Sequence, residues 1–341
     1  MNACTARATR SKQPAMRLAL LLVILVGCGS DGGSGTPHDA AVDAKPDAPA
    51  KLIDAPEAPA GFTHYVIDHV NVPSNNQQAR AYGLDLNNDQ TVDNQLGMVI
   101  ATLSGMGFDS QGAMNKSVDQ GDTIMLGNLG AADFTTDAMS TFTIYQGENP
   151  MPSPCTNAQD TVCRKHLSGM ASFSIKPSAP VDPALMGTIA AGKLVAGPGH
   201  LTIQFSMAYS PSIMLTLLGA RVELTTTKTS LSGKVAGAIP KTDVDMKILP
   251  AMRDGFEAVI AKDCTMLTSP PNCGCGAGSQ GKTLLGLFDT TPQDCNITLT
   301  EVQNNSLIQS LLAPDVTVEG KQCLSLGLGV TAVNGGFAAP M

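Results

Sequence analysis

The residues between Asp85 and Asp93 form the sequence's clearest set of oxygen ligands for a metal ion. The segment reads DLNNDQTVD, with Asp85, Asn87, Asp89 and Asp93 at positions 1, 3, 5 and 9 of a loop and Thr91 at position 7. Calcium takes oxygen ligands, and loops that wrap it supply side chains at positions 1, 3, 5 and 9 and a backbone carbonyl at position 7. We therefore expect Asp85, Asn87, Asp89, Thr91 and Asp93 to bind calcium.

This loop resembles the calcium loops of EF-hands, dockerins and thrombospondin type 3 repeats, and the resemblance covers one loop only. Gln90 stands at position 6, where such loops have a glycine for the sharp turn, and Leu96 stands at position 12, where they have an acid. Additional ligands would come from acids elsewhere or from water. The resemblance implies the affinity of extracellular modules, about 10⁻⁴ to 10⁻³ M. The alternative is an Asx-rich turn that caps a helix starting near Asn94 without any ion.

A second segment, residues 288–301, carries a weaker version of the same spacing. With Glu301 at position 12, Asp294 falls at position 5, but Pro292 stands at position 3, Cys295 at position 6, and Asp289 comes one residue too early. We expect this segment to be a degenerate, EF-hand-like unit that holds no metal.

Residues 276–283 read GAGSQGKT and match the phosphate-binding pattern GxxxxGK[ST]. Such a loop needs a buried apolar strand before it, so that backbone amides and a helix N-terminus meet the phosphate. Here two prolines and two cysteines precede it, and we expect a glycine-rich loop instead. No GxSxG or HExxH motif occurs, and the five histidines are scattered, so the sequence names no catalytic residue.

The first 27 residues predict an export signal. An apolar run extends from Leu18 to Val26 and is too short to span a membrane. The residues before it include four basic residues and no acidic one. The run ends Leu25-Val26-Gly27-Cys28, which resembles the lipobox of bacterial lipoproteins, although an ordinary signal with a chance cysteine is the alternative. The resemblance implies cleavage before Cys28 and acylation of Cys28 as the membrane anchor. Because residue 29 is not Asp, it also implies the outer membrane.

Residues 28–60 contain mostly Gly, Ala, Asp and Pro and have almost nothing to bury, so we expect a disordered tether. Its Asp-Ala and Ala-Pro units are similar to the tethers of uncharacterised myxobacterial lipoproteins. Residues 61–341 are expected to form the globular domain, with room for a sub-boundary near residue 240.

The composition of the chain disfavours several partners. The net charge is −8, and removal of the four basic residues of the signal makes it −12, which argues against nucleic acid and anionic lipid. There is no tryptophan and only 4% of the residues are aromatic, which weakens a carbohydrate-binding hypothesis.

Seven cysteines remain once Cys4 and Cys28 are set aside. In an oxidising envelope we expect disulfides. Cys155 and Cys163 should pair, and the other candidates are Cys264, Cys273, Cys275 and Cys295. A zinc site made of those last four is the alternative. Cys323 is the expected unpaired thiol, because it stands at position 9 of a third calcium-loop-like segment that begins at Asp315.

Hydrophobic patterning predicts a sheet followed by helices. Strands are expected at residues 64–72, 123–129, 139–145, 171–175, 188–195, 201–209, 213–227, 231–238 and 324–330. Helices are expected at 96–103, 244–260, 282–288 and 300–312, with Thr242 as the N-cap and Pro250 as a kink of the second. This grouping predicts an α+β fold: an antiparallel sheet or sandwich core, short N-terminal helices and a C-terminal helical region stapled by disulfides.

Together these features favour a non-enzymatic, calcium-stabilised binding or structural module, held on the outer membrane by its N-terminal lipid, with a protein or small molecule as its ligand. The alternative is a secreted hydrolase with an unrecognised active site, because catalytic groups can assemble in space from distant positions.

Overall fold

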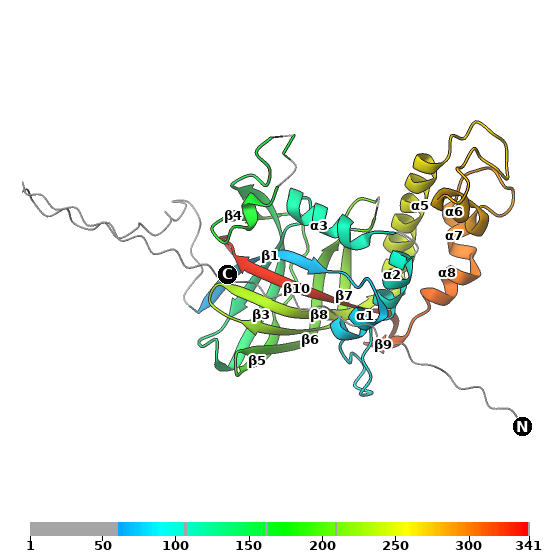
Figure 1. Ribbon diagram of the computed structural model, residues 1–341. Helices are drawn as coiled ribbons and strands as arrows, with labels where there is room; N and C mark the ends of the chain where they lie inside the picture. Colours follow the sequence, from blue (N-terminus) through cyan, green and yellow to red (C-terminus); the bar gives the residue numbers. More distant parts are fainter. Residues whose placement is uncertain (1–60, 106–107, 158, 161–162, 209, 340–341) are drawn as a thin grey trace, which may run out of the picture. The chain divides into compact units, whose positions relative to one another are not determined.

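The computed structural model describes residues 61–339, apart from 106–107, 158, 161–162 and 209. In this part of the chain, eight antiparallel strands close into a barrel (Figure 1). They pair in the order β1-β2-β3-β5-β6-β7-β8-β10, and β10 pairs back to β1. The strands are β1 Phe62–Asn71, β2 Met125–Gly130, β3 Thr136–Met151, β5 Leu185–Ala190, β6 Lys193–Phe205, β7 Ile213–Thr226, β8 Ser230–Pro240 and β10 Lys321–Asn334. The antiparallel sheet is confirmed, and it closes into a barrel, in which each of these strands has a partner on both sides.

The predicted signal, Cys28 and the tether lie outside the described residues. Within the described part, residues on both sides of position 240 share one hydrophobic core. The chain leaves the barrel after β8, forms helices and returns as β10, so the last barrel strand depends on both segments.

Side chains fill the interior of the barrel. Alternate residues along each strand point inward, as the period of two requires. A hollow among these side chains is only about 10 Å³, no larger than one water molecule, and is lined by Ile67, Val70, Met125, Ile144, Ile203, Gln204, Val235, Leu328 and Val330. A barrel of eight strands is just wide enough to be filled in this way or to hold one small ligand. This barrel is filled, so its axis offers no ligand cavity.

The two ends of the barrel differ. At one end the strands are joined by short turns at residues 131–135, 191–192 and 227–229, and β1 begins there at Phe62. At the other end lie the long connections: β1 to β2, β3 to β5, and β8 to β10. We call this end the mouth, and every described helix belongs to one of its connections.

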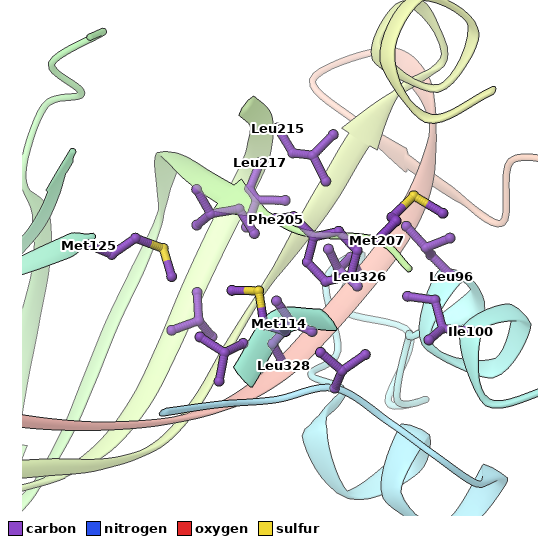
Figure 2. Packing of buried hydrophobic residues seen from close by; sticks show 14 of the residues in the cluster. Leu96, Ile100, Met114, Met125, Phe205, Met207, Leu215, Leu217, Leu326 and Leu328 are labelled. Carbon is purple, nitrogen blue, oxygen red and sulfur yellow. The ribbon is translucent and has the colours of Figure 1, made fainter. Parts of the chain in front are cut away.

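Three helices connect β1 to β2: α1 Asn76–Tyr82, α2 Gln95–Gly105 and α3 Ser110–Gln120. Only α2 is predicted by the sequence. Figure 2 shows Leu96 and Ile100 of α2 and Met114 of α3 packed among Phe205, Leu326 and Leu328 of the strands. The β3 to β5 connection carries η1 Lys165–Leu167 and β4 Ser172–Ile175, which pairs with β3.

The predicted strand at 188–195 is wrong in one respect. It is a hairpin, in which β5 ends at Ala190, the turn lies at Ala191 and Gly192, and β6 begins at Lys193. Both turn residues have positive φ, 50° and 77°, which is the backbone conformation that a tight two-residue hairpin requires.

The long helix after β8 begins earlier than predicted and contains a π-helical turn. Pro240, not Thr242, precedes the first helical residue, and the segment comprises α4 Lys241–Asp243, η2 Val244–Ile248 and α5 Leu249–Asp263. Pro250 has no backbone N–H to donate to the carbonyl four residues earlier. The structure accommodates this with the wider π turn immediately before the proline, where we expected a kink.

The remaining helices are α6 Gln280–Phe288, α7 Leu299–Asn304 and α8 Ser306–Leu311, followed by β9 Val316–Val318. Figure 1 shows α5 to α8 grouped together. The predicted helix at 300–312 is divided at Asn305. The side-chain oxygen of Asn305 accepts hydrogen bonds from the amides of Leu307 and Ile308 and thereby caps a new helix.

Three disulfides occur among the described residues: Cys155 with Cys163, Cys264 with Cys275, and Cys273 with Cys295. Cys323 is a free and buried thiol. The zinc alternative is wrong, because all four of its sulfur atoms are joined in disulfides.

Candidate functional site

The Asp85 loop is anchored on the outer wall of the barrel. Leu84 and Leu86 are buried in a small cluster with Leu218, Ala236, Ala238, Val316, Val318 and Cys323. The base of the loop is closed by the Asp93 amide, which donates to the Leu84 carbonyl at 3.0 Å, and by the Leu86 amide, which donates to Asp93 Oδ2 at 2.7 Å. The predicted ligand segment is therefore a closed loop on a rigid base.

Inside the loop, the side-chain oxygens point back onto the loop's own backbone. Asp85 Oδ1 accepts from the Asp89 amide at 3.2 Å, and Asp85 Oδ2 accepts from the Gln90 amide at 2.9 Å. Asn87 Oδ1 also accepts from the Asp89 amide, and Asp89 Oδ1 accepts from the Thr91 amide at 2.8 Å. These are Asx turns, which form without an ion.

The sharp turn at position 6 is made without glycine. Asn88 and Gln90 have φ of 63° and 70°, in the left-handed region that non-glycine residues seldom adopt. The departure at Gln90 therefore does not prevent the turn. Arg221 of β7 donates to Asn88 Oδ1 at 2.8 Å and ties the loop to the barrel.

The pKa values of Asp89 and Asp93 are shifted in opposite directions. Hydrogen bonds from the Thr91 hydroxyl and amide and from Asn87 lower the pKa of Asp89. Burial raises the pKa of Asp93 despite its bond from Leu86, and the charges of Asp315, Asp89 and Asp85 raise it further. Asp93 thus lies among the negative charges of Asp315, Asp89 and Asp85.

Asp315, the first residue of the third loop-like segment, contributes to this charge. Its two carboxylate oxygens accept hydrogen bonds from the amide and the hydroxyl of Ser325 on β10. Cys323, at position 9 of the same segment, lies in the apolar cluster beneath the loop, and burial raises the pKa of its thiol.

Within the described residues, no group of three or more His, Cys, Asp or Glu side chains has an arrangement that could hold a metal ion. For calcium to bind in the Asp85 loop, Asn87 and Asp89 would have to exchange their mutual hydrogen bonds for the ion. The structure also contains the helix cap of the alternative hypothesis. At the start of α2, Asn94 Oδ1 accepts a hydrogen bond from the Gly97 amide at 3.0 Å. The expected ligand residues lie on one loop, and this geometry needs no ion.

The Asp289 loop follows α6 and is more deeply buried. Asp289 is only 5% exposed, and its two oxygens accept from the amides of Asp294 at 3.1 Å and Cys295 at 2.9 Å. Glu301 accepts from the amides of Thr290 and Thr298, both at 2.8 Å. The Cys273–Cys295 disulfide closes the loop covalently.

The phosphate-loop match at residues 276–283 does not form a phosphate site. The Asp263 carboxylate accepts from the Gly281 amide at 2.9 Å, and the Ser279 hydroxyl accepts from the Lys282 amide. A carboxylate thus occupies the start of α6, where a phosphate would bind. The Cys264–Cys275 disulfide lies immediately before the segment, in place of the required strand.

The mouth of the barrel contains a pocket that the sequence does not indicate. It has a volume of about 650 Å³ and lies between one face of α3 and the connection from β6 to β7. Its lining comprises Asp109, Gly112, Ala113, Lys116, Ser117, Gln120, Asp122, Ser206, Met207, Ala208, Ser210, Pro211 and Ser212. Small-molecule sites are found at barrel mouths and have volumes in this range.

Three hydroxyl groups that line this pocket contact a fourth, which is buried and does not line it, and we call the four the hydroxyl cluster. They belong to Ser117 of α3, Thr123 before β2, Ser206 after β6 and Ser212 before β7. Ser117 and Thr123 are 2.7 Å apart, as are Ser206 and Ser212, and three contacts of 3.2 to 3.3 Å join these pairs.

The sequence missed this site because it missed α3. Gly112 and several polar residues hide the helix, yet Asp109 is a good N-cap, and Met114 and Val118 are spaced four apart. Even with α3 recognised, the four hydroxyls come from segments up to 95 residues apart, and no local pattern connects them.

The two buried histidines, His64 on β1 and His166 on η1, do not line the pocket. The ring of His64 stacks on Phe337 with centroids 4.1 Å apart. His166 is fully buried beside Phe173, and burial lowers its pKa to about 4. Both rings are therefore neutral packing groups at pH 7.

Of the helices in the described part of the chain, none combines the length and apolar character needed to cross a membrane. In comparisons with known proteins, no protein-family model, curated protein or solved structure matches the chain.

Proposed function

We propose that this chain is a bacterial lipoprotein, anchored through Cys28 in the outer membrane, whose barrel serves as a non-enzymatic binding module stabilised by calcium. The observation that carries the binding role is the contrast between the filled barrel axis and the 650 Å³ pocket at the mouth. A ligand site in this barrel belongs at the mouth, because the interior has no room for one.

The anchor is tested with Cys28→Ala in the full chain. Because two or three acyl chains attach a protein firmly, the wild-type chain should sediment with membranes and the variant should remain soluble or uncleaved. Mass spectrometry of the mature N-terminus provides the second measurement. An unacylated terminus on the wild-type chain would contradict the anchor.

Calcium is tested by thermal unfolding of the full chain with 10 mM calcium and with a chelator. An affinity of 10⁻⁴ to 10⁻³ M corresponds to about 1 to 3 kcal/mol of stabilisation at that concentration, a shift of several degrees in Tm. Magnesium at the same concentration is the control for ionic strength. Identical midpoints in calcium and chelator would remove calcium from the proposal.

The competing proposal is a secreted hydrolase. The hydroxyl cluster supplies four potential nucleophiles, but no histidine is among the described residues that line the pocket, and a serine nucleophile needs a neighbouring base. Incubation of the full chain with generic ester, peptide and glycoside substrates separates the two proposals. Turnover that is abolished by Ser212→Ala would favour the hydrolase.

A further inference from the structure

We infer that the mouth pocket binds a small primary ammonium ion, whose N–H groups donate to the hydroxyl cluster and whose charge lies near Asp122. This inference names the ligand class of the pocket and rests on the binding role proposed above. Three features carry it: the supply of protons in the cluster, the charges around the pocket, and the apolar hollow beside it.

The hydroxyl cluster has more contacts than protons. Five oxygen–oxygen contacts of 2.7 to 3.3 Å join four hydroxyl groups. Each hydroxyl group donates one proton and has two lone pairs. Four protons can satisfy at most four of the five contacts, and at least four lone pairs remain free. The cluster is therefore an acceptor site, complementary to a ligand that brings additional N–H or O–H donors.

Burial raises the free-energy cost of the lone pairs that accept no hydrogen bond within the cluster. Thr123 and Ser206 are 2% and 3% exposed, while Ser212 is partly exposed at the pocket surface. Polar atoms removed from water cost free energy when their hydrogen-bonding capacity is unused. A donor that enters the pocket would meet acceptors that bulk water reaches poorly.

The charges around the pocket favour a cation. Two carboxylates, Asp109 and Asp122, and one amine, Lys116, line it. Asp109 is engaged as the N-cap of α3, where its Oδ1 accepts from the Gly112 amide at 2.7 Å. Asp122 is exposed and forms no ion pair with another described residue, so its carboxylate is available. Ammonium-to-carboxylate hydrogen bonds are about twice as strong as neutral ones.

The neighbouring surface has room for a short aliphatic chain. Pro211 separates the pocket from a second hollow of about 340 Å³, which is lined by Ile213, Met214, Met246 and Pro250 among other residues. A quaternary ammonium group has no N–H to donate to the hydroxyl cluster, whereas a primary ammonium ion has three, so a primary amine fits better.

The test uses isothermal titration of the full-length protein in 5 mM calcium at pH 7.5 with four matched probes. These are n-butylamine, N,N,N-trimethylbutylammonium, butan-1-ol and butyrate. Butylamine should bind with a dissociation constant near or below about 1 mM, within the range for a ligand of this size. The quaternary ion should bind at least tenfold more weakly, because it keeps the charge but lacks the donors. Butyrate should not bind.

Variants of the pocket test the direction in which each side chain changes the affinity for butylamine. Asp122→Asn should weaken butylamine about tenfold, whereas Lys116→Gln should strengthen it a few-fold by removing a repelling charge. Thr123→Val should weaken it, with its melting curve as the check on folding. Ser232→Ala is the matched control, because Ser232 is exposed on β8 and does not line the pocket, and it should leave the affinity unchanged.

The inference is overturned if the quaternary ion or butyrate binds as tightly as butylamine, if Lys116→Gln weakens butylamine, or if no probe binds at 50 mM. These failures differ from a failure of the calcium proposal. Butylamine binding is measured by heat in the presence of calcium, whereas the calcium proposal fails only when calcium and chelator give the same Tm.

Discussion

The Asp85 loop and the Asp289 loop use the same device in different surroundings. In each, the first aspartate accepts hydrogen bonds from two consecutive backbone amides: residues 89 and 90 in one loop, and residues 294 and 295 in the other. Each loop then leads into a helix with a side-chain cap, provided by Asn94 or Thr298. The local chemistry of Asp and Asn produces this arrangement in both places.

The loops differ in what holds them closed. The Asp289 loop has a buried aspartate, a disulfide at Cys295 and Glu301, whose carboxylate folds back onto Thr290 and Thr298. The Asp85 loop has Leu96 where that acid would be, no disulfide, and largely exposed side chains. The Asp289 loop is therefore complete without an ion, whereas the Asp85 loop leaves negative charge that a cation could neutralise.

The largest expected effect comes from removing the covalent closure with Cys273→Ala and Cys295→Ala together. The bond spans 22 residues, so its loss should lower the free energy of unfolding by about 3 kcal/mol through loop-closure entropy. Denaturant unfolding measures the loss, and hydrogen exchange locates it at the Asp294 and Cys295 amides.

The matched control replaces Cys155 and Cys163 by alanine. This variant should also lose stability, but without faster exchange at residues 294 and 295. Unchanged exchange there in the first variant would mean that the disulfide does not hold the Asp289 loop.

The second largest effect distinguishes the first aspartate of the Asp289 loop from that of the Asp85 loop. Asp289→Asn should cost about 2 kcal/mol, because an amide cannot accept both buried N–H groups and presents a donor to one of them. Urea unfolding in chelator provides the measurement. The calcium-induced shift in Tm should persist in this variant. Its loss would show that the calcium response does not come from the Asp85 loop alone.

Asp85→Asn should cost less, about 1 kcal/mol in chelator, because its loop is solvent-exposed and asparagine still supports an Asx turn. The same variant should abolish the calcium-induced shift in Tm by removing a charged ligand. A full calcium response in Asp85→Asn would favour the ion-free capping interpretation of this loop.

The smallest effect concerns pH and Glu301. Burial alone would raise the pKa of this carboxyl, but the hydrogen bonds from Thr298 and Thr290 outweigh it and lower the pKa below the ordinary value of 4.5. The ionised carboxylate therefore contributes stability that is present above about pH 4.5 and lost as the pH falls through the folded-state pKa. Glu301→Gln should lose less than about 1 kcal/mol at pH 7.

The stability difference between wild type and Glu301→Gln should shrink as the pH falls from 6 to 3, as followed by urea unfolding. Glu148→Gln, on β3 and outside both loops, controls for loss of a carboxylate. A difference that stays constant with pH would show that the Glu301 charge does not hold the Asp289 loop.

Local patterns predicted much of the fold. Alternation at residues 324–330 and 231–238 identified β10 and β8, and the helical period identified α2, α5 and α6. The short spacing of Cys155 and Cys163 identified one disulfide. These predictions are confirmed because they depend only on the nearby chain. The nearby chain sets the period of side chains on a strand or a helix and the distance that a short loop can span.

Other features of the sequence misled or gave no signal. Pro250 suggested a kink, but a π turn absorbs its missing N–H, and Ala191 and Gly192 did not reveal that a predicted strand is a hairpin. Neither α1 nor α3 has an apolar stripe strong enough to be recognised. Their positions follow from packing against β10 and β1, which the nearby sequence does not specify.

From its own residues, the sequence determined most of the barrel strands and the helices α2, α5 and α6, that Asp85 to Asp93 form a tight loop, and which cysteine is left over. Tertiary structure alone decided that the sheet closes by pairing β1 with β10, that its axis is filled, and that Ser117, Thr123, Ser206 and Ser212 meet at the mouth. The physical reason is that local periodicity sets the direction of a side chain, whereas its distant neighbours are set by how the whole barrel packs.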